Sequence, residues 1–160
     1  MSLYSALWVN NPFLKKYFIS YILHFLTLSI GSLIYIFFRS DTLVLFTWIG
    51  YFENIYEFVF CLREYTVDLA TYFPTWFIYS FPDGMWVSSY IFLLLMIFDF
   101  KIKRNNIFLI FLIPIIGLFS EFGQYFGLVS GTFDFIDVLL YLVCSLIPFL
   151  ILKKIIKYEY

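Results

Sequence analysis

Two pairs of polar residues with the same spacing lie close together in the C-terminal half of the chain. Glu121 and Gln124 are three positions apart, and so are Asp134 and Asp137. Residues three apart on a helix lie on one face, so each pair can present its side chains to a common site. Carboxylates grouped in this way can bind a divalent cation or take part in acid–base chemistry. The spacing predicts a polar site and leaves both chemistries, and the identity of any metal, open.

Two further residues belong to this candidate site. Thr132 comes just before Asp134, and Asp83 stands between Pro82 and Gly84 at the start of an apolar run. Both positions have a simpler structural interpretation. Thr132 or Asp134 can cap the helix that follows, and a Pro-Asp-Gly sequence is typical of a turn or a helix start. The predicted site comprises Asp83, Glu121, Gln124, Thr132, Asp134 and Asp137.

Glu121 is the member of this set that helix capping does not explain. It is expected near the C-terminal end of a helix and among apolar neighbours, where the helix dipole disfavours a negative charge. Such a carboxyl group must be protonated, paired with a cation such as Arg39 or Arg63, or hydrogen-bonded to a neighbour. We therefore expect Glu121 to be functionally or structurally indispensable.

Other signatures of catalysis are missing from the sequence. It has no nucleophile–base–orienter set, no glycine-rich phosphate loop and no His/Cys cluster with metal-ligand spacing. Cys61 and Cys144 lie far apart and predict no disulfide. The single histidine, His24, is interpreted as a hydrogen-bonded packing residue rather than a proton relay. These observations predict no cofactor and favour binding over catalysis.

The composition predicts the elements that must carry these residues. Of the 160 residues, 63% are hydrophobic and 13% are charged, whereas soluble domains are about 45–50% apolar and about 25% charged. Four apolar stretches, at about residues 17–38, 84–98, 107–122 and 135–152, reach or approach the roughly 20 residues that a spanning helix needs. The predicted fold is an all-α polytopic membrane protein, a single domain over residues 1–160 with about four transmembrane helices. The net charge of −1 gives no basis for nucleic-acid binding.

The basic residues predict how these helices are oriented. Eight of the ten Lys and Arg residues flank one set of helix ends, and they are Lys15, Lys16, Lys101, Lys103, Arg104, Lys153, Lys154 and Lys157. Arg39 and Arg63 lie at the other set. Because basic loops are retained in the cytoplasm, both termini are predicted to be cytoplasmic. The helix ends that carry the polar site would then face the outer side.

The segment of about residues 41–83 is predicted to lie on the outer surface of the membrane. Its acidic residues alternate with Trp, Tyr and Phe, which collect in the headgroup layer. We expect one or two short helices there that cover the outer end of the bundle. The alternative, two additional spans, would bury Glu53, Glu57 and Arg63 in lipid at a cost of several kcal/mol.

The stretch GLFSEFGQYFGLVSGTFDFIDVLLYLVCSL, at residues 117–146, resembles the core signature of VanZ-like membrane proteins. That signature is a Glu-x-x-Gln at the end of one span, a short loop, and Thr-Phe-Asp with a further Asp opening the next span. The PDGMW run at residues 82–86 is similar to a companion motif in a small-protein branch of the family. The chain departs from the family pattern where Gly131 replaces an Arg, Tyr141 an Asn and Cys144 a Gly. The missing Arg removes the obvious cation for the acidic cluster.

The resemblance implies a bacterial envelope protein of the inner, cytoplasmic membrane. The founding member of the family is associated with low-level resistance to glycopeptide antibiotics of the teicoplanin type. We predict a protein that binds or modifies a lipid-linked or lipophilic envelope molecule in an outer-leaflet polar pocket, with membrane lipids as partners. One alternative is a small enzyme of lipid or cell-wall precursor metabolism that uses the paired carboxylates with a metal. The other is a transporter or channel subunit with Glu121 as a proton or cation site, and it would require a homo-oligomer.

Overall fold

The computed structural model describes residues 12–159, so residues 1–11 and Tyr160 of the predicted domain lie outside the description. The described part of the chain is mostly helical. Its helices are α2 (Pro12–Phe38), α3 (Val44–Ile49), α4 (Glu53–Ala70), α5 (Thr75–Tyr79), α6 (Phe81–Ile97), α7 (Ile107–Tyr125) and α8 (Phe135–Leu152). Two short strands, β1 (Lys101–Lys103) and β2 (Lys157–Glu159), follow α6 and α8.

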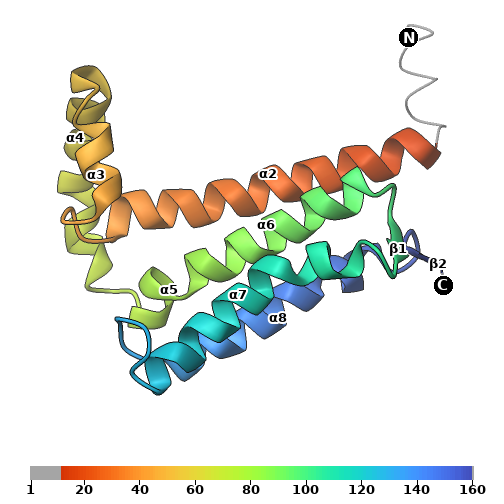
Figure 1. The fold of residues 1–160 in the computed structure, drawn as a ribbon. Helices are drawn as coiled ribbons and strands as arrows, with labels where there is room; N and C mark the ends of the chain where they lie inside the picture. The colour runs from red at the N-terminus through yellow and green to blue at the C-terminus, as the bar shows by residue number, and fades with distance from the viewer. Residues whose placement is uncertain (1–11, 160) are drawn as a thin grey trace, which may run out of the picture.

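The long helices α2, α6, α7 and α8 run in alternating directions along one bundle (Figure 1). Helix α6 lies at the centre and packs mainly against α2 and α8. Ile91, Phe92 and Leu95 of α6 are fully buried, and they form the core together with Phe100 and Ile110. A helix that is apolar all round is expected in such a central place.

Two glycines allow the helices around α6 to approach closely. A Cβ atom added at Gly31 of α2 would lie 2.9 Å from the Pro82 carbonyl oxygen of α6. A Cβ atom at Gly84 would lie 2.8 Å from Cys144 Sγ of α8. Small residues at helix contacts are typical of membrane bundles because they let two backbones come together.

Three of the helices are long and apolar enough to cross a membrane, namely the segments Leu14–Phe38, Ile107–Tyr125 and Phe135–Leu152. Helix α6 is a shorter apolar helix of 17 residues. It begins at Phe81, before the predicted boundary at residue 84, because Pro82 and Asp83 suit the first turn of a helix. Many large apolar side chains of α2, α7 and α8 point outward. This arrangement is consistent with an all-α membrane protein.

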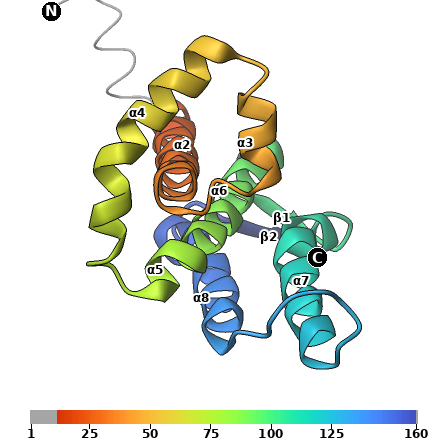
Figure 2. The same ribbon diagram turned by 90° about the vertical axis from the view of Figure 1, so that its left-hand side faces the viewer.

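The segment predicted to hold one or two short helices contains α3, α4 and α5, and α4 has 18 residues. Helices α3 and α4 lie across the end of α2 rather than alongside it (Figures 1 and 2). Phe46 of α3 is buried, and its ring meets that of Phe60 of α4 edge-on, with 6.0 Å between the centroids. These helices lie at the end of the bundle at which α2 stops, where α4 packs against α2 and α3 packs against α4.

Arg63 of α4 holds this helix against the end of α2. Its guanidinium donates hydrogen bonds to the carbonyl oxygen of Ile36 and, at 2.7 Å, to that of Arg39. Thr66 Oγ1 donates to the Phe37 carbonyl oxygen at 2.9 Å. The last carbonyl groups of a helix have no partners within the helix, so these side chains satisfy them. Of the possible partners named for Glu121, Arg63 is therefore engaged elsewhere, with the end of α2.

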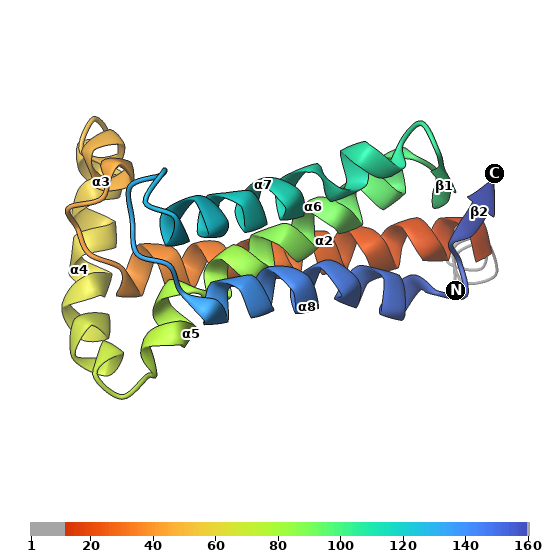
Figure 3. The same cartoon turned by 60° about the horizontal axis from the view of Figure 1, so that its bottom comes forward.

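The opposite end of the bundle carries the two strands, which the sequence did not predict. β1 and β2 pair in parallel beside the start of α2 (Figure 3). Glu159 bridges Lys101 at 3.0 Å and Lys103 at 2.8 Å, and these lysines hold the pKa of its carboxyl group below the usual range. Asp99, just after α6, is exposed and accepts a hydrogen bond from the Tyr17 hydroxyl group.

Candidate functional site

A polar cavity of about 510 Å³ lies at the same end of the bundle as α3 and α4. The turn between α5 and α6, the end of α7 and the start of α8 form its walls. All of the predicted site residues line this cavity, namely Asp83, Glu121, Gln124, Thr132, Asp134 and Asp137. The structure thus brings together side chains from three helices and one loop that are up to 54 positions apart in the chain.

Glu121 and Asp134 bind the local backbone as well as lining the cavity. Glu121 is 5% exposed, and its Oε2 accepts a hydrogen bond from the Asp134 backbone N–H at 3.2 Å. Asp134 Oδ1 accepts from the Ile136 N–H at 2.8 Å and caps α8. The capping interpretation is confirmed for Asp134. Glu121 therefore ties the end of α7 to the start of α8, which accounts for a carboxylate near a helix C-terminus.

The loop between α7 and α8 depends on Gly131. Its φ of +136° is unfavourable for residues with a side chain, and an added Cβ atom would lie 2.7 Å from Gln124 Nε2. The Gln124 amide therefore lies directly against the backbone of this loop. A side chain at residue 131 would therefore need both a strained backbone and a displaced Gln124 amide.

The cation of the cavity comes from a different part of the chain. Arg39, just after α2, lines the cavity and donates from Nη1 to the Tyr79 carbonyl oxygen at 3.2 Å. Its guanidinium lies over the rings of Tyr79 and Tyr35, 4.9 and 5.1 Å from their centroids. Within residues 12–159 it forms no ion pair within 4.0 Å, although Asp83 is close enough to interact with it electrostatically. Arg39 thus supplies the positive charge that the absence of an Arg at residue 131 seemed to remove.

Two oxygen atoms at the cavity are buried and have no hydrogen-bond partner among the described residues. One is Oγ of Ser80, a residue that is 1% exposed, and the other is Oδ1 of Asp137. Both residues line the cavity. Buried polar atoms in proteins nearly always have partners, so these two atoms point to a polar occupant.

Tyr141 also lines the cavity. In the sequence it was a departure from the VanZ-like pattern and was not among the predicted site residues. It lies four positions after Asp137, so both residues share one face of α8. Its ring packs on Gly117 of α7, where an added Cβ atom would lie 3.0 Å from Tyr141 Cζ. The helical spacing from Asp137 was the signal that could have identified it. Arg39 was named as one possible cation for Glu121, whereas Ser80 carries no comparable signal in the sequence.

A second, largely apolar cavity of about 500 Å³ continues from the polar one between α6 and α7. Asp83, Ser120 and Tyr141 line both cavities. Farther along, the second cavity is lined by Val87, Tyr90, Ile113 and Ile116, among others. A polar chamber at the helix ends therefore continues into an apolar groove that follows the bundle axis.

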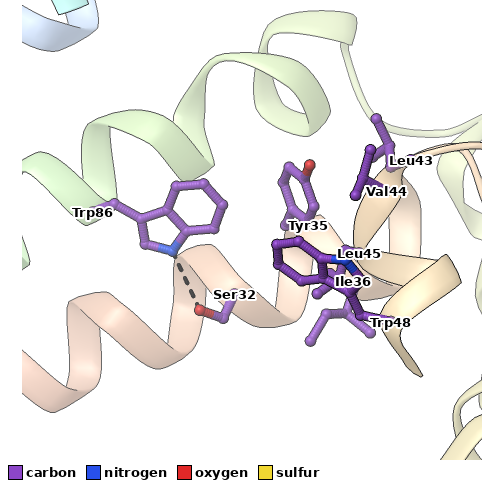
Figure 4. Close-up of a pocket in the computed structure, with 8 residues that line it drawn as sticks. All are labelled: Ser32, Tyr35, Ile36, Leu43, Val44, Leu45, Trp48 and Trp86. Atoms are coloured by element: carbon purple, nitrogen blue, oxygen red, sulfur yellow. Dashed lines mark hydrogen bonds between the residues drawn. The ribbon is translucent and has the colours of Figure 1, made fainter. Parts of the chain in front are cut away.

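A separate apolar pocket of about 480 Å³ lies between the end of α2 and α3 (Figure 4). Trp48 and Trp86 line it, and Trp86 Nε1 donates a hydrogen bond to Ser32 Oγ at 3.2 Å. Its walls carry no charged side chain. Polar recognition is therefore concentrated in the cavity that holds the carboxylates.

His24 lies outside these cavities and behaves as predicted. Its Nδ1 is 2.9 Å from the Ser89 carbonyl oxygen and 2.8 Å from Ser89 Oγ. Cys144 is buried, Cys61 is exposed, and both are free thiols. Over residues 12–159, no three His, Cys, Asp or Glu side chains are grouped so that they could hold a metal ion.

Comparison with known proteins adds no relative, because no protein-family model, no curated protein and no solved structure matches this chain.

Proposed function

We propose that this chain is a membrane protein that binds a lipid or lipid-linked molecule, with the polar headgroup in the carboxylate-lined cavity. The observation that carries this proposal is the continuity of the polar cavity with the apolar groove, through Asp83, Ser120 and Tyr141. An amphiphile needs such a site because its two parts require different surroundings. A charged headgroup must keep its hydrogen bonds, while a hydrocarbon chain gains free energy from apolar contact.

In the proposed arrangement α2, α6, α7 and α8 all cross the bacterial inner membrane. Helix α6 has 17 residues, which gives a length of about 25 Å at roughly 1.5 Å per residue, a few ångströms short of a typical hydrocarbon core of about 30 Å. The basic residues of the β1–β2 end would face the cytoplasm. The cavity and the helices α3 and α4 would then lie at the outer surface.

Binding is favoured over catalysis because two of the carboxylates already have structural roles. Glu121 accepts the backbone N–H of Asp134, and Asp134 caps α8. A hydrogen bond accepted from the backbone takes up part of the capacity of each carboxylate to accept a substrate proton. The remaining carboxylates, Asp83 and Asp137, suit recognition of a polar group.

The VanZ-like resemblance is consistent with this proposal and supports a location of the protein in the bacterial envelope. The residues that carry the resemblance, including Glu121, Gln124 and Asp137, all face the same cavity. An envelope precursor or the lipid tail of a glycopeptide antibiotic would satisfy both the headgroup chamber and the groove. In the cell, we propose that such binding contributes to glycopeptide resistance.

Lipid occupancy of the purified protein tests the proposal. We expect native mass spectrometry of gently extracted protein to show a bound lipid, and the Ser120→Phe variant to lose most of it, because the larger ring fills the junction of chamber and groove. Phe119→Leu is the matched control on the same helix, since Phe119 is 71% exposed on the outer face. A wild-type protein without bound lipid, or full occupancy in a correctly folded Ser120→Phe variant, would contradict the proposal.

A further inference from the structure

The charges of the polar cavity are arranged on two sides. Arg39 lies on the side of α2 and α5, where it contacts Tyr79. Glu121 and Asp137 lie on the side of α7 and α8, and Asp83 of α6 is close enough to interact electrostatically with both sides. A ligand in this cavity therefore meets a guanidinium on one wall and carboxylates on the other.

Three groups in the cavity remain available to a ligand. Arg39 forms no ion pair within residues 12–159. Asp137 Oδ1 has no hydrogen-bond partner in the same range, and neither does Ser80 Oγ, although both atoms are buried. A buried carboxylate oxygen requires a donor, preferably a charged one, and a guanidinium requires an anion. The site thus needs a positive hydrogen-bond donor and a negative acceptor within one ligand.

We propose that the occupant is a zwitterionic phospholipid whose headgroup carries a primary ammonium group beside its phosphate. This inference rests on the proposed lipid-binding function and names the class of lipid. The phosphate pairs with Arg39 and accepts a hydrogen bond from Ser80 Oγ. The ammonium N–H groups donate to Asp137 Oδ1 and to the Asp83 carboxylate. An acyl chain follows the groove past Val87, Ile113 and Ile116.

Other headgroups satisfy this set of groups less well. An anionic headgroup without an amine carries the same phosphate charge but offers no cation to the four carboxyl groups that line the cavity, those of Asp83, Glu121, Asp134 and Asp137. A quaternary ammonium group carries the positive charge but has no N–H to donate to Asp137 Oδ1, which would stay buried without a partner. A primary amine supplies both the charge and the donors.

Competition between defined lipids tests the inference. Purified protein is offered equal amounts of phosphatidylethanolamine, phosphatidylcholine and phosphatidylglycerol with the same acyl chains, and the bound species are counted by native mass spectrometry. We expect a preference for phosphatidylethanolamine over phosphatidylcholine of about tenfold, which corresponds to one charged hydrogen bond. Asp137→Asn should reduce that preference, and Asp137→Glu, which keeps the charge, should retain most of it.

Arg39 has a different expected effect, because every one of these lipids carries a phosphate. Arg39→Gln should weaken binding of all three by a similar factor and leave the preference among them unchanged. The matched controls are Asp68→Asn and Arg104→Gln, which alter exposed charges outside the cavity and should change neither affinity nor preference.

The outcomes separate this inference from the proposed function. Equal binding of phosphatidylethanolamine and phosphatidylcholine, preferential binding of phosphatidylglycerol, or an unchanged preference in Asp137→Asn would overturn the headgroup inference and leave lipid binding standing. If the wild-type protein retains none of the three lipids and no co-extracted lipid, the proposed function itself fails.

Discussion

At the scale of single residues, Glu121 has the most specific role. Its carboxylate is buried and accepts one backbone N–H group across the loop between α7 and α8. The bond is only part-buried and Asp134 is exposed, so its loss costs about the net contribution of one intramolecular hydrogen bond. Glu121 therefore affects the geometry of the cavity as well as its charge.

We expect Glu121→Ala to destabilise the protein by about 0.5–1.5 kcal/mol, the usual net contribution of one hydrogen bond. Glu121→Gln keeps a carbonyl oxygen that can accept from the Asp134 N–H and should cost clearly less. Thermal unfolding of the two variants in detergent checks this order. Equal losses in the two variants would show that the hydrogen bond to Asp134 is not what Glu121 contributes.

Gly131 and Gln124 show how much of the site is set by backbone rather than by charge. The positive φ of Gly131 would strain any residue with a side chain, and such a side chain would also have to displace the Gln124 amide. The positive charge of the cavity comes instead from Arg39, on the side of α2.

At the scale of elements, the contact between α4 and the end of α2 positions Arg39. Arg63 Nη2 donates to the Arg39 carbonyl oxygen at 2.7 Å, and its guanidinium lies 4.5 Å from the centroid of the Phe46 ring. Arg63 and Thr66 together satisfy three carbonyl groups. Those of Ile36 and Phe37 belong to the last turn of α2, and that of Arg39 lies just beyond it. Helix α4 therefore contributes to the site, since it fixes the backbone from which Arg39 reaches the cavity.

We expect Arg63→Ala to loosen α4 from α2, with a loss of about 1.5–3 kcal/mol for hydrogen bonds that involve a charged donor. Hydrogen exchange should become faster throughout α4 and α3 and stay unchanged in the middle of α6. Glu64→Ala, which changes an exposed neighbour on the same helix, is the control. If the hydrogen-exchange protection of α4 is unchanged in Arg63→Ala, apolar contacts alone hold α3 and α4 in place.

At the scale of the whole molecule, charge and polarity are divided between the two ends of the bundle. The strands β1 and β2 lie at one end of the bundle, and the loop between α7 and α8 lies at the other (Figure 3). The strands carry three lysines, and the carboxylates of the cavity lie near that loop. Consecutive long helices alternate in direction, so the chain returns to the same end after every second helix. The proposed orientation, with the basic end in the cytoplasm, follows from this division.

The two native cysteines allow a test of that orientation. Cys61 of α4 is exposed and Cys144 is 2% exposed. We expect a membrane-impermeant maleimide added to intact cells to label Cys61 and to spare Cys144. In a Cys61→Ser background, Ser130→Cys should also react from outside, whereas Asn105→Cys should react only after permeabilisation. Labelling of Ser130→Cys only after permeabilisation would place the cavity in the cytoplasm and remove the proposed outer-leaflet site.

The sequence by itself determined the long helices and the residues of the acidic cluster. Apolar runs of near-spanning length form helices wherever they lie, because a helix satisfies its own backbone hydrogen bonds. The i, i+3 spacings of Glu121 with Gln124 and of Asp134 with Asp137 likewise depend only on local geometry. Capping of α8 by Asp134 was predictable for the same reason.

The tertiary structure alone decided which distant groups complete the cavity. Arg39, Ser80 and Tyr141 join it because α2, α5 and α8 meet around α6, and no local spacing encodes that meeting. The hydrogen bonds from Arg63 to the carbonyl groups at the end of α2 are contacts of the same kind, and so is the pairing of β1 with β2 across 53 intervening positions. Such contacts depend on how whole helices pack, so they become visible only when the chain is folded.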